Sequence, residues 1–186
     1  MNVVLVNGID DISKWKDHEE SLKFLKEELT EEGFTVEYFP VRDMNLHYCQ
    51  GCWDCWTKTP GVCRMRDDGE KYLKAIKDAD YLLYCSPVKA GFITTETKKA
   101  LDRFIPNVLP YISIYDKECH HLDRYPKREK VLGVVLMDDG DITDKSSDMI
   151  FRNFDRIQKN MRSEKSIRYK LTKENRKELL NEIINN

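Results

Sequence analysis

Residues 131–137 read V-L-G-V-V-L-M, an apolar run without a charged side chain. Residues 3–6 (V-V-L-V) and 81–85 (Y-L-L-Y-C) have the same character. Short continuous apolar runs are typical of strands buried on both faces of a parallel sheet. Residues 35–39 and 167–171 instead alternate polar and apolar side chains, which indicates strands with one exposed face. The sequence therefore predicts five strands of two kinds.

Helical patterns separate these strands. Leu22, Leu25 and Leu29 recur at helical spacing, and similar stripes precede the strand at 81–85 and follow the strand at 131–137. Alternation of strands and helices predicts an α/β fold with a mostly parallel sheet. Because half-exposed strands suit the edges of a sheet, the pattern favours the flavodoxin-like doubly wound order 2-1-3-4-5, with helices on both faces.

Several boundaries follow from local signals. Ser86-Pro87 is expected to end the third strand, and residues 88–92 are expected to form a loop. Asp17 with Glu20 forms a capping pair for the first helix, and Thr172 caps the last one. Residues 106–129 carry no clear period and are expected to be irregular.

The bulk composition fits one domain. The chain has 186 residues, 40% hydrophobic and 34% charged, so we expect a single globular domain over residues 1–186. Its 31 basic and 33 acidic residues give a net charge of −2, which offers no reason to expect nucleic acid as a partner. We expect no signal peptide and no membrane-spanning segment. Six cysteines without an export signal favour the cytoplasm.

Four of these cysteines lie in the segment 48–66, which we expect to be inserted after the second strand. The segment reads Y-C-Q-G-C-W-D-C-W-T-K-T-P-G-V-C-R-M-R, with the spacing C-x2-C-x2-C-x7-C. This spacing resembles the thiolate supply of an iron–sulfur cluster, whereas structural zinc takes two C-x2-C pairs set further apart. Reduced, packed cysteines remain the alternative. The candidate metal ligands are Cys49, Cys52, Cys55 and Cys63.

In a sheet of this order, ligands bind beyond the carboxyl ends of the strands, where the first and third strands diverge. Three loops meet there, beginning at Gly8, at Ser86 and at Asp138. The cysteine segment leaves the second strand on the same side. We therefore expect a cofactor held by these loops to lie close to a cluster held by the cysteines.

Three stretches together carry a family resemblance. Residues 43–68 (D-M-N-L-H-Y-C-Q-G-C-W-D-C-W-T-K-T-P-G-V-C-R-M-R-D-D), 79–88 (A-D-Y-L-L-Y-C-S-P-V) and 97–106 (T-K-K-A-L-D-R-F-I-P) resemble the NAD(P)H-dependent FMN reductase and iron–sulfur flavoprotein family. The resemblance covers about residues 20–112. It implies FMN as cofactor, a homodimer or homotetramer, a reduced nicotinamide or protein electron donor, and a [4Fe–4S] cluster on the cysteine motif. By position it also implies a flavin-binding loop made of Ser86, Pro87, Val88, Lys89, Ala90 and Gly91.

Two departures from the family pattern concern the FMN site. The family has a Gly/Ser-rich, basic phosphate loop after the first strand, whereas this chain reads G-I-D-D-I-S-K-W-K-D-H-E-E-S. Asp10 and Asp11 would repel a phosphate, and Gly8, Ser13 and Ser21 remain the candidate contacts, with Lys14 beside them. Lys89 also stands where the family often has an aromatic residue.

Other features of the sequence have mainly structural interpretations. Cys119-His120-His121 is interpreted as a solvated loop rather than a metal site, and Cys85 as core. His47 is a candidate for tuning a cluster by hydrogen bonding. The acidic residues Asp138, Asp139, Asp141 and Asp144 are interpreted as a solvated loop and helix cap, and Trp53 and Trp56 as buried side chains.

Three functional hypotheses remain open. The first is an FMN-dependent oxidoreductase or electron-transfer flavoprotein with an iron–sulfur cluster, which acts with a small-molecule or protein redox partner. Because the cofactor performs the chemistry, no side chain is required as an acid or base. The second is a non-enzymatic flavodoxin-like protein whose cysteines bind zinc or sense redox state. The third is a flavin-only quinone or nitro-compound reductase with unmetallated cysteines.

Overall fold

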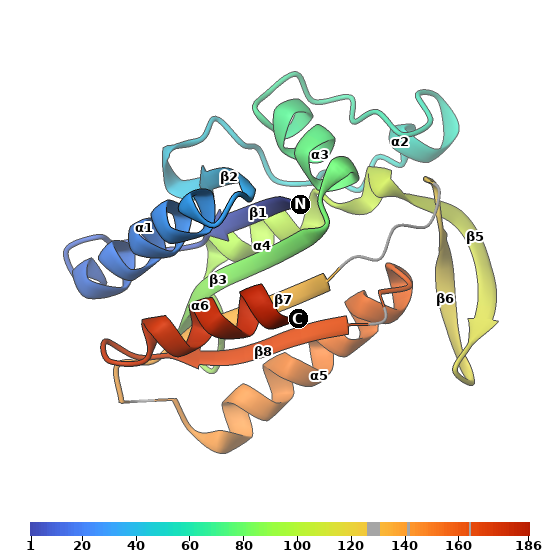
Figure 1. Cartoon of the computed structure of the whole chain (residues 1–186). Helices are drawn as coiled ribbons and strands as arrows, with labels where there is room; N and C mark the ends of the chain where they lie inside the picture. Colours follow the sequence, from blue (N-terminus) through green and yellow to red (C-terminus); the bar gives the residue numbers. More distant parts are fainter. Residues whose placement is uncertain (126–130, 141, 164) are drawn as a thin grey trace.

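The predicted parallel sheet is confirmed. We describe residues 1–125, 131–140, 142–163 and 165–186 of a computed structural model. Five parallel strands lie in the order β2-β1-β3-β7-β8, which is the predicted order 2-1-3-4-5 (Figure 1). Their bounds are β1 (Asn2–Asn7), β2 (Thr35–Pro40), β3 (Tyr81–Lys89), β7 (Val131–Met137) and β8 (Lys165–Leu171).

The helices form a layer on each face of the sheet. The α-helices are α1 (Lys16–Glu31), α2 (Asp54–Thr57), α3 (Gly69–Asp78), α4 (Thr95–Asp102), α5 (Asp144–Asn160) and α6 (Arg176–Asn185), and the 3-10 turns are η1 (Val41–Asp43) and η2 (Ile105–Asn107). Leucines of α1 and α6 pack on one face of the sheet, with Val3 and Leu5 of β1. The helices α3, α4 and α5 pack on the other face, with Val4 and Val6. In the described part of the chain no helix is both long and apolar enough to span a membrane.

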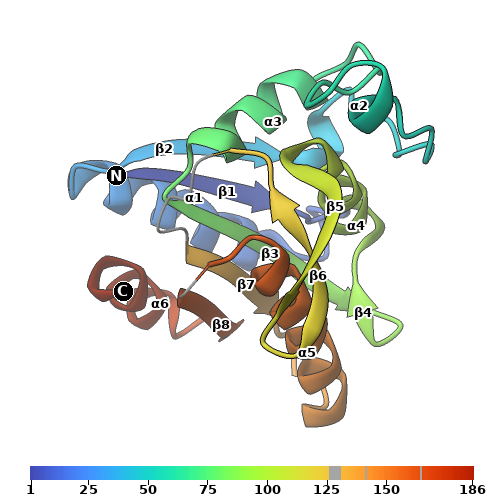
Figure 2. The ribbon, with the colours of Figure 1, turned by 90° about the vertical axis from the view of Figure 1, so that its right-hand side faces the viewer.

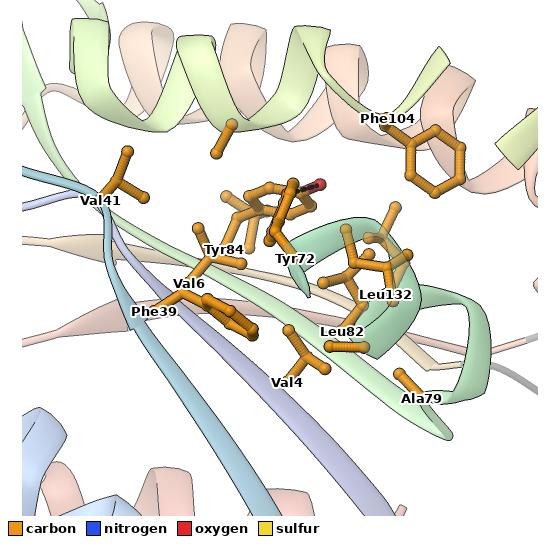
Figure 3. Close-up of a cluster of buried hydrophobic side chains, with 14 of the residues drawn as sticks. Val4, Val6, Phe39, Val41, Tyr72, Ala79, Leu82, Tyr84, Phe104 and Leu132 are labelled. Carbon is orange, nitrogen blue, oxygen red and sulfur yellow. Dashed lines mark hydrogen bonds between the residues drawn. The ribbon is translucent and has the colours of Figure 1, made fainter. Parts of the chain in front are cut away.

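The character of each strand follows from this layering. Every described side chain of β7 is buried, because successive residues face the two helical layers in turn. The edge strands β2 and β8 keep part of their side chains exposed, as their alternating sequences predicted. Figure 3 shows one of the two cores, in which the hydroxyls of Tyr72 and Tyr84 pair at 2.9 Å inside an otherwise apolar cluster.

The predicted end of the third strand is wrong. β3 continues through Ser86 and Pro87 to Lys89 and turns back as the short antiparallel strand β4 (Phe92–Ile93). β1 stops opposite Cys85, so the later residues of β3 have a parallel neighbour only on the β7 side. Pro87 can occupy a strand there because no partner needs its missing N–H on the open side. Residues 88–92 are therefore the tip of a hairpin and not an open loop.

The segment 106–129, predicted to be irregular, contains a second hairpin, and its residues 126–129 lie outside the described residues. β5 (Val108–Tyr115) and β6 (Glu118–Asp123) pair as an antiparallel ribbon that crosses beside the main sheet (Figure 2). Asp116 and Lys117 connect them with positive φ angles of 48° and 63°, the backbone conformation of a tight hairpin turn. Cys119, His120 and His121 lie on β6, so their assignment to a solvated loop is wrong, and His120 is buried.

Two predicted helix caps are also wrong. The residue before α1 is Trp15, which makes no side-chain capping bond, so Asp17 and Glu20 lie inside the helix. The last helix begins after Asn175, because the Asn175 side chain accepts the backbone N–H of Thr172 and holds residues 172–175 in a turn. Thr172 therefore precedes the helix rather than capping it.

Candidate functional site

The carboxyl end of β1 lies against the beginning of α4. The Gly8 N–H donates to the Cys85 carbonyl at 2.8 Å, and the Thr94 hydroxyl donates to the Gly8 carbonyl at 2.6 Å. A β-carbon on Gly8 would lie 1.8 Å from Thr97 Oγ1. Glycine is therefore required here for the close approach of β1 to α4, and both backbone groups of Gly8 already have protein partners.

The predicted flavin-binding loop divides into a buried part and an exposed part. Ser86 is fully buried, and its hydroxyl donates to the Pro87 carbonyl at 2.8 Å and accepts the Thr94 N–H at 3.0 Å. Lys89 and Ala90 are exposed, and Val88 and Gly91 are partly so. Ala90 and Gly91 form the hairpin turn with φ angles of 49° and 77°. Only the tip, residues 88–91, is therefore available to a ligand.

The serines proposed as phosphate contacts differ in accessibility. Ser13 is exposed, and its hydroxyl donates to Asp11 at 2.6 Å, which together with the Ser13 N–H lowers the pKa of Asp11. Ser21 is buried in α1, where its hydroxyl donates to the Asp17 carbonyl at 2.9 Å. Ser13 thus remains a candidate contact, whereas Ser21 is held inside the helix.

Ion pairs connect the three loops at this edge. Lys89 at the tip of the β3–β4 hairpin pairs with Asp10 in the loop after β1. Lys14 lies 3.6 Å from Asp139 in the loop after β7. Of the two acidic side chains that would repel a phosphate, Asp10 therefore has a cationic partner, and the loops are brought together as the sheet topology predicted.

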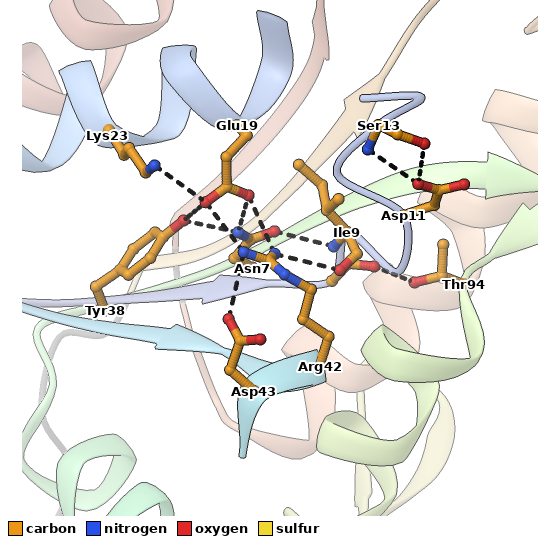
Figure 4. Close-up of polar contacts among 11 residues, drawn as sticks. Asn7, Ile9, Asp11, Ser13, Glu19, Lys23, Tyr38, Arg42, Asp43 and Thr94 are labelled. Carbon is orange, nitrogen blue, oxygen red and sulfur yellow. Dashed lines mark hydrogen bonds and ion pairs between the residues drawn. The ribbon is translucent and has the colours of Figure 1, made fainter. Parts of the chain in front are cut away.

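A buried carboxylate lies under the same loop. Glu19, in the first turn of α1, accepts hydrogen bonds from Asn7 Nδ2 at 2.8 Å and from both terminal nitrogens of Arg42 at 3.1 and 3.2 Å (Figure 4). The Tyr38 hydroxyl donates to it as well, at 3.2 Å. Burial acts to raise the pKa of Glu19, but these hydrogen bonds and the Arg42 charge outweigh it and hold the pKa below its usual value. The network fixes the start of α1 on the ends of β1 and β2.

Sequence reasoning missed this network although a signal existed. Trp15, Glu19 and Leu22 recur at helical spacing, so Glu19 shares the buried stripe of α1 while its neighbour Glu20 is exposed. A charged residue on an apolar stripe predicts a buried partner of opposite charge, and Arg42 is that partner.

The four cysteines of the segment line one small cavity. Cys49, Cys52, Cys55 and Cys63 line a small cavity of about 20 Å³, together with residues at the end of α4. All six cysteines are free thiols. Burial, and next the charges of Cys63, Cys49 and Cys52, raise the pKa of Cys55 to about 11. Within the described residues, no group of three or more His, Cys, Asp or Glu side chains is arranged to hold a metal ion.

These observations bear on the fit of a cluster. Four thiols on one cavity are the ligand type and number that iron–sulfur clusters and zinc require. A cysteine thiol loses its proton on metal binding, because the positive charge of the metal stabilises the thiolate that coordinates it. The donor set therefore fits a metal centre in its chemistry, although its described side chains are not arranged around a metal position.

A buried ion pair closes the base of the cysteine segment. Arg103, 1% exposed, donates to Asp67 at 2.7 and 2.8 Å and to the His47 carbonyl at 2.8 Å. Asp67 also accepts the His47 N–H at 2.9 Å. Burial acts to raise the pKa of Asp67, but the hydrogen bonds of Arg103 and His47 hold it well below its usual range. Arg103 thus joins the chain before the first cysteine to the chain after the last.

The aromatic residues of the segment behave differently from one another. Trp56 donates its indole N–H to the Val108 carbonyl at 2.9 Å and is partly buried. Trp53 stacks on it with ring centres 4.6 Å apart but is 47% exposed, so its predicted burial is wrong. Trp53 also has a left-handed φ of 60°, a conformation uncommon for an aromatic residue.

The other residues singled out from the sequence have structural partners. Cys85 is buried as predicted, and burial raises its pKa to about 12. His47 contacts Asp67 through Nδ1 at 3.1 Å. His120 contacts Glu118 and Asn160. Asp144, predicted to lie in the acidic loop, is the first residue of α5 and pairs with Lys170, and Asp141 lies outside the described residues.

The two candidate sites lie at opposite ends of α4. Thr94 and Thr97 at its beginning contact Gly8 and Ser86, while Arg103 just after its end lines the cysteine cavity. An eight-residue helix is about 12 Å long. The expectation that the cysteine segment lies beside the cofactor loops is therefore wrong, because about one helix length separates the two sites.

Comparison with known proteins places these features in a family. The sequence profile described as NADPH-dependent FMN reductase matches residues 1–122. An iron–sulfur flavoprotein of Archaeoglobus fulgidus is 33% identical over 79 residues, which cover 42% of this chain and 35% of that protein. An iron–sulfur flavoprotein of Methanocaldococcus jannaschii is 36% identical over 78 residues, covering 42% and 39%. The match thus spans less than half the length of either curated relative.

Solved structures agree on the fold. A structure described as an FMN-dependent NADH-azoreductase from Bacillus anthracis str. Ames Ancestor in complex with FMN covers 100% of this chain and 98% of its own, with a TM-score of 0.65 and 14% identity. An azoreductase from Bacillus anthracis str. Sterne covers 100% and 93%, with a TM-score of 0.61 and 13% identity. At such low identity these structures establish the flavodoxin-like fold alone. With about two thirds of its length matched by the family profile, the chain belongs to the NADPH-dependent FMN reductase family.

Proposed function

We propose that the protein is an FMN-dependent oxidoreductase that takes electrons from a reduced nicotinamide and passes them to a small acceptor, with a [4Fe–4S] cluster on Cys49, Cys52, Cys55 and Cys63. The observation that carries this proposal is the gathering of all four thiols on one cavity, one helix away from the edge where flavodoxin-like sheets bind ligands. The family membership and the iron–sulfur flavoproteins among the relatives support it.

The residues at the carboxyl edge would hold FMN at two places, its phosphate and its flavin ring. Ser13 and Lys14 would contact the phosphate, with Gly8 shaping the loop, and the backbone of Val88, Lys89, Ala90 and Gly91 would face the flavin ring. Ser86 and Pro87 would support that hairpin from below, and Ser21 would act only within α1. When bound, FMN supplies hydride acceptance and one- or two-electron transfer. The ion pair between Lys89 and Asp10 lies between these parts, so it must open or shift for the cofactor to enter.

The cysteine segment would serve as a one-electron relay. Cys55 is the most buried of the four thiols, which suits a ligand on the protein side of a cluster, while Cys49 and Cys52 face solvent. Arg103 places a buried positive charge beside the thiols, which favours the negative charge of a thiolate-ligated centre. Bound iron supplies the single-electron chemistry.

We further propose the setting in which the protein works. Residues 1–186 would form one flavodoxin-like domain, with residues 48–66 as an insertion after β2. Six free thiols suit the reducing cytoplasm. Tyr111, Ile112 and Ile114 of the β5–β6 hairpin are 67%, 61% and 72% exposed, an apolar surface that suits a homodimer or homotetramer or a protein redox partner.

An absorbance spectrum of protein purified without oxygen, with iron and flavin assays, tests the proposal. We expect about one FMN and about four iron atoms per chain, with flavin bands over the broad absorption of an iron–sulfur cluster. Protein without flavin bands, and without binding of added FMN, would refute an FMN-dependent function. Flavin without iron would instead leave a flavin-only reductase.

A second candidate is a non-enzymatic flavodoxin-like protein whose cysteines bind zinc or respond to oxidation. The ion pair between Lys89 and Asp10, which joins two of the loops at the flavin edge, favours it. Metal analysis separates the two functions: about one zinc, no iron and no FMN binding would support this second candidate.

A further inference from the structure

The tip of the β5–β6 hairpin is held against α5 by polar contacts. No side chain of residues 109–122, all of which are described, belongs to either apolar core. The hairpin lies instead beside the carboxyl end of α5 (Figure 2). Just beyond that end, Arg162 donates to the Ser113 hydroxyl at 2.7 Å, and its guanidinium carbon lies 4.1 Å from the centre of the Tyr115 ring. The position of the tip therefore depends on charged and hydrogen-bonding groups.

One buried histidine connects the hairpin to α5. His120 is 4% exposed, and in the ladder it lies opposite Ser113, so both residues share the face of the hairpin that meets the helix. Its ring nitrogen Nε2 lies 3.0 Å from Glu118 Oε2. Its other ring nitrogen, Nδ1, lies 3.2 Å from Oδ1 of Asn160, the last residue of α5. The ring thus contacts one group of its own strand and one group of the helix.

Both neighbours of the ring are hydrogen-bond acceptors. The backbone N–H of His121 donates to Asn160 Oδ1 at 3.0 Å, and this contact fixes the amide with its oxygen, which can only accept, toward His120. Hydrogen bonds from Lys159 and then from His120 hold the pKa of Glu118 below its usual value, so Glu118 is a carboxylate and only accepts. A neutral imidazole has one N–H, whereas the two contacts need two. Both contacts are therefore complete only when the ring carries two protons.

The other charges around the ring balance one another. Among the described residues, the charged groups that face it are Arg156 and Lys159 of α5, Glu118 of β6 and Asp116 of the hairpin turn. The two cations are paired with the two carboxylates at 2.8 to 3.3 Å. β5 contributes the Tyr115 ring, 6.5 Å from the His120 ring between centres, and Arg162 lies over that same tyrosine. The carboxyl end of α5 adds partial negative charge, which favours the charged form of a histidine placed there.

We propose that His120 is a proton-controlled latch between the β5–β6 hairpin and α5. With both ring nitrogens protonated, the hairpin is docked through Glu118 and Asn160. When the ring loses one proton to solvent, one acceptor is left without a donor and the hairpin loosens. A histidine that gains partners in its charged form stabilises the docked state at low pH, and this stabilisation is lost as the pH rises. The position of Ile112 and Ile114, exposed on the other face of the hairpin, thereby depends on pH.

Hydrogen exchange of the backbone amides of residues 112–121 measures the docking. A two-stranded hairpin is only marginally stable by itself, so its amides exchange readily once it leaves α5. From about pH 5.5 to 9, we expect protection, corrected for the intrinsic exchange rate, to fall about ten- to hundredfold, the effect of losing one hydrogen bond to a charged group. The nitrogen-15 spectrum of the His120 ring should show two N–H groups at the lower end of this range. The latch is independent of the bound cofactor, so the full chain is used as purified.

Two variants and a control identify the group responsible. His120→Phe keeps a ring but removes both donors, so protection of the hairpin should lose its pH dependence. Asn160→Asp keeps an acceptor for the His121 N–H and adds a negative charge beside His120, so the loss of protection should move to higher pH. The matched control Lys117→Gln removes an exposed cation from the turn of the same hairpin and should keep the wild-type pH dependence. Wild-type protection that does not change with pH, a pH dependence that persists in His120→Phe, or a His120 ring with one N–H at about pH 5.5 would overturn the latch.

Discussion

Replacing Arg103 with methionine removes the cation that holds the two ends of the cysteine segment together. Methionine keeps most of the apolar stem of arginine, so the change is confined mainly to charge and hydrogen bonding. The variant loses two hydrogen bonds to Asp67, at 2.7 and 2.8 Å, and one to the His47 carbonyl, at 2.8 Å. Asp67, with a fully buried side chain, is left without its charged partner.

The expected cost follows from this burial. Exposed ion pairs contribute about 0.2–1 kcal/mol, whereas removing one member of a buried pair costs about 3–5 kcal/mol because a charge remains buried without compensation. The pair here is 1% and 0% exposed, so the larger range applies. In a chain of this size, about 4 kcal/mol corresponds to a fall of about 8–16 °C in melting temperature.

The pH dependence of stability tests whether the buried pair with Asp67 is what Arg103 contributes. The folded pKa of Asp67 lies well below its usual value, so the stabilisation from the pair is fully present above the unfolded pKa and is lost as the pH falls toward the folded one. The difference in free energy of unfolding between wild type and Arg103→Met should therefore be constant above about pH 5 and shrink at lower pH.

Urea unfolding followed by circular dichroism measures these free energies, with Asp67→Asn and the double variant completing a mutant cycle. Lys98→Met is the matched control, since it breaks the exposed pair with Asp102 on the same helix and should cost less than about 1 kcal/mol. A loss of unfolding free energy below about 1 kcal/mol in Arg103→Met, or a loss that grows as the pH falls from 5 to 3, would refute this account of the Arg103–Asp67 ion pair.

Three further predictions concern the two candidate sites. Gly8→Ala should destabilise the protein by about 2 kcal/mol or more, since the new methyl group would overlap Thr97 Oγ1, and Thr97→Ala in the same chain should restore part of the loss in thermal melts. Cys55→Ser should remove most of the bound iron in anaerobic preparations, while Cys119→Ser, an exposed cysteine on β6, should keep it; equal iron in both would exclude the cysteine cavity as the cluster site. Asp10→Asn should tighten FMN binding about two- to fivefold in a fluorescence titration at low salt, because a negative charge near the phosphate is removed and Lys89 is released, and the gain should disappear at high salt.

The edge strands were predictable because they depend on burial. Strands flanked by helices on both faces have continuous apolar sequences and edge strands have alternating ones, and with the second and fifth strands at the edges the pattern matched the doubly wound order 2-1-3-4-5. The ends of individual strands and the position of the second hairpin were harder to predict from the sequence. The turn between β5 and β6 is made by Asp116 and Lys117, where the usual Asn-Gly signal is absent, and the positive φ angles come from the paired strands.

The loops at the carboxyl edge of the sheet were predictable in position, whereas the cysteine segment, expected beside them, lies at the other end of α4. Sheet topology correctly brought the loops at Gly8, Lys89 and Asp139 together, because the carboxyl ends of parallel strands share one edge. The partners of Asp67 and Glu19 were not predictable from spacing in the same way. Arg103 lies 36 residues beyond Asp67, and nothing local to either residue identifies the other.

Helix α4 gives the molecule a fixed relation between its flavin edge and its cysteine cavity. Its first turn is held by Thr94 and Thr97 against Gly8, and its end is held by Arg103 against Asp67. An α-helix changes length very little, so the separation of the two sites is set by residue count and not by loop conformation. If the proposed cofactors bind at the two ends of α4, one helix length would separate them, and the loops at either end would have to open at the small cysteine cavity and at the Lys89–Asp10 pair. A rigid spacer with adaptable ends is the arrangement that an electron relay between two separately bound centres needs.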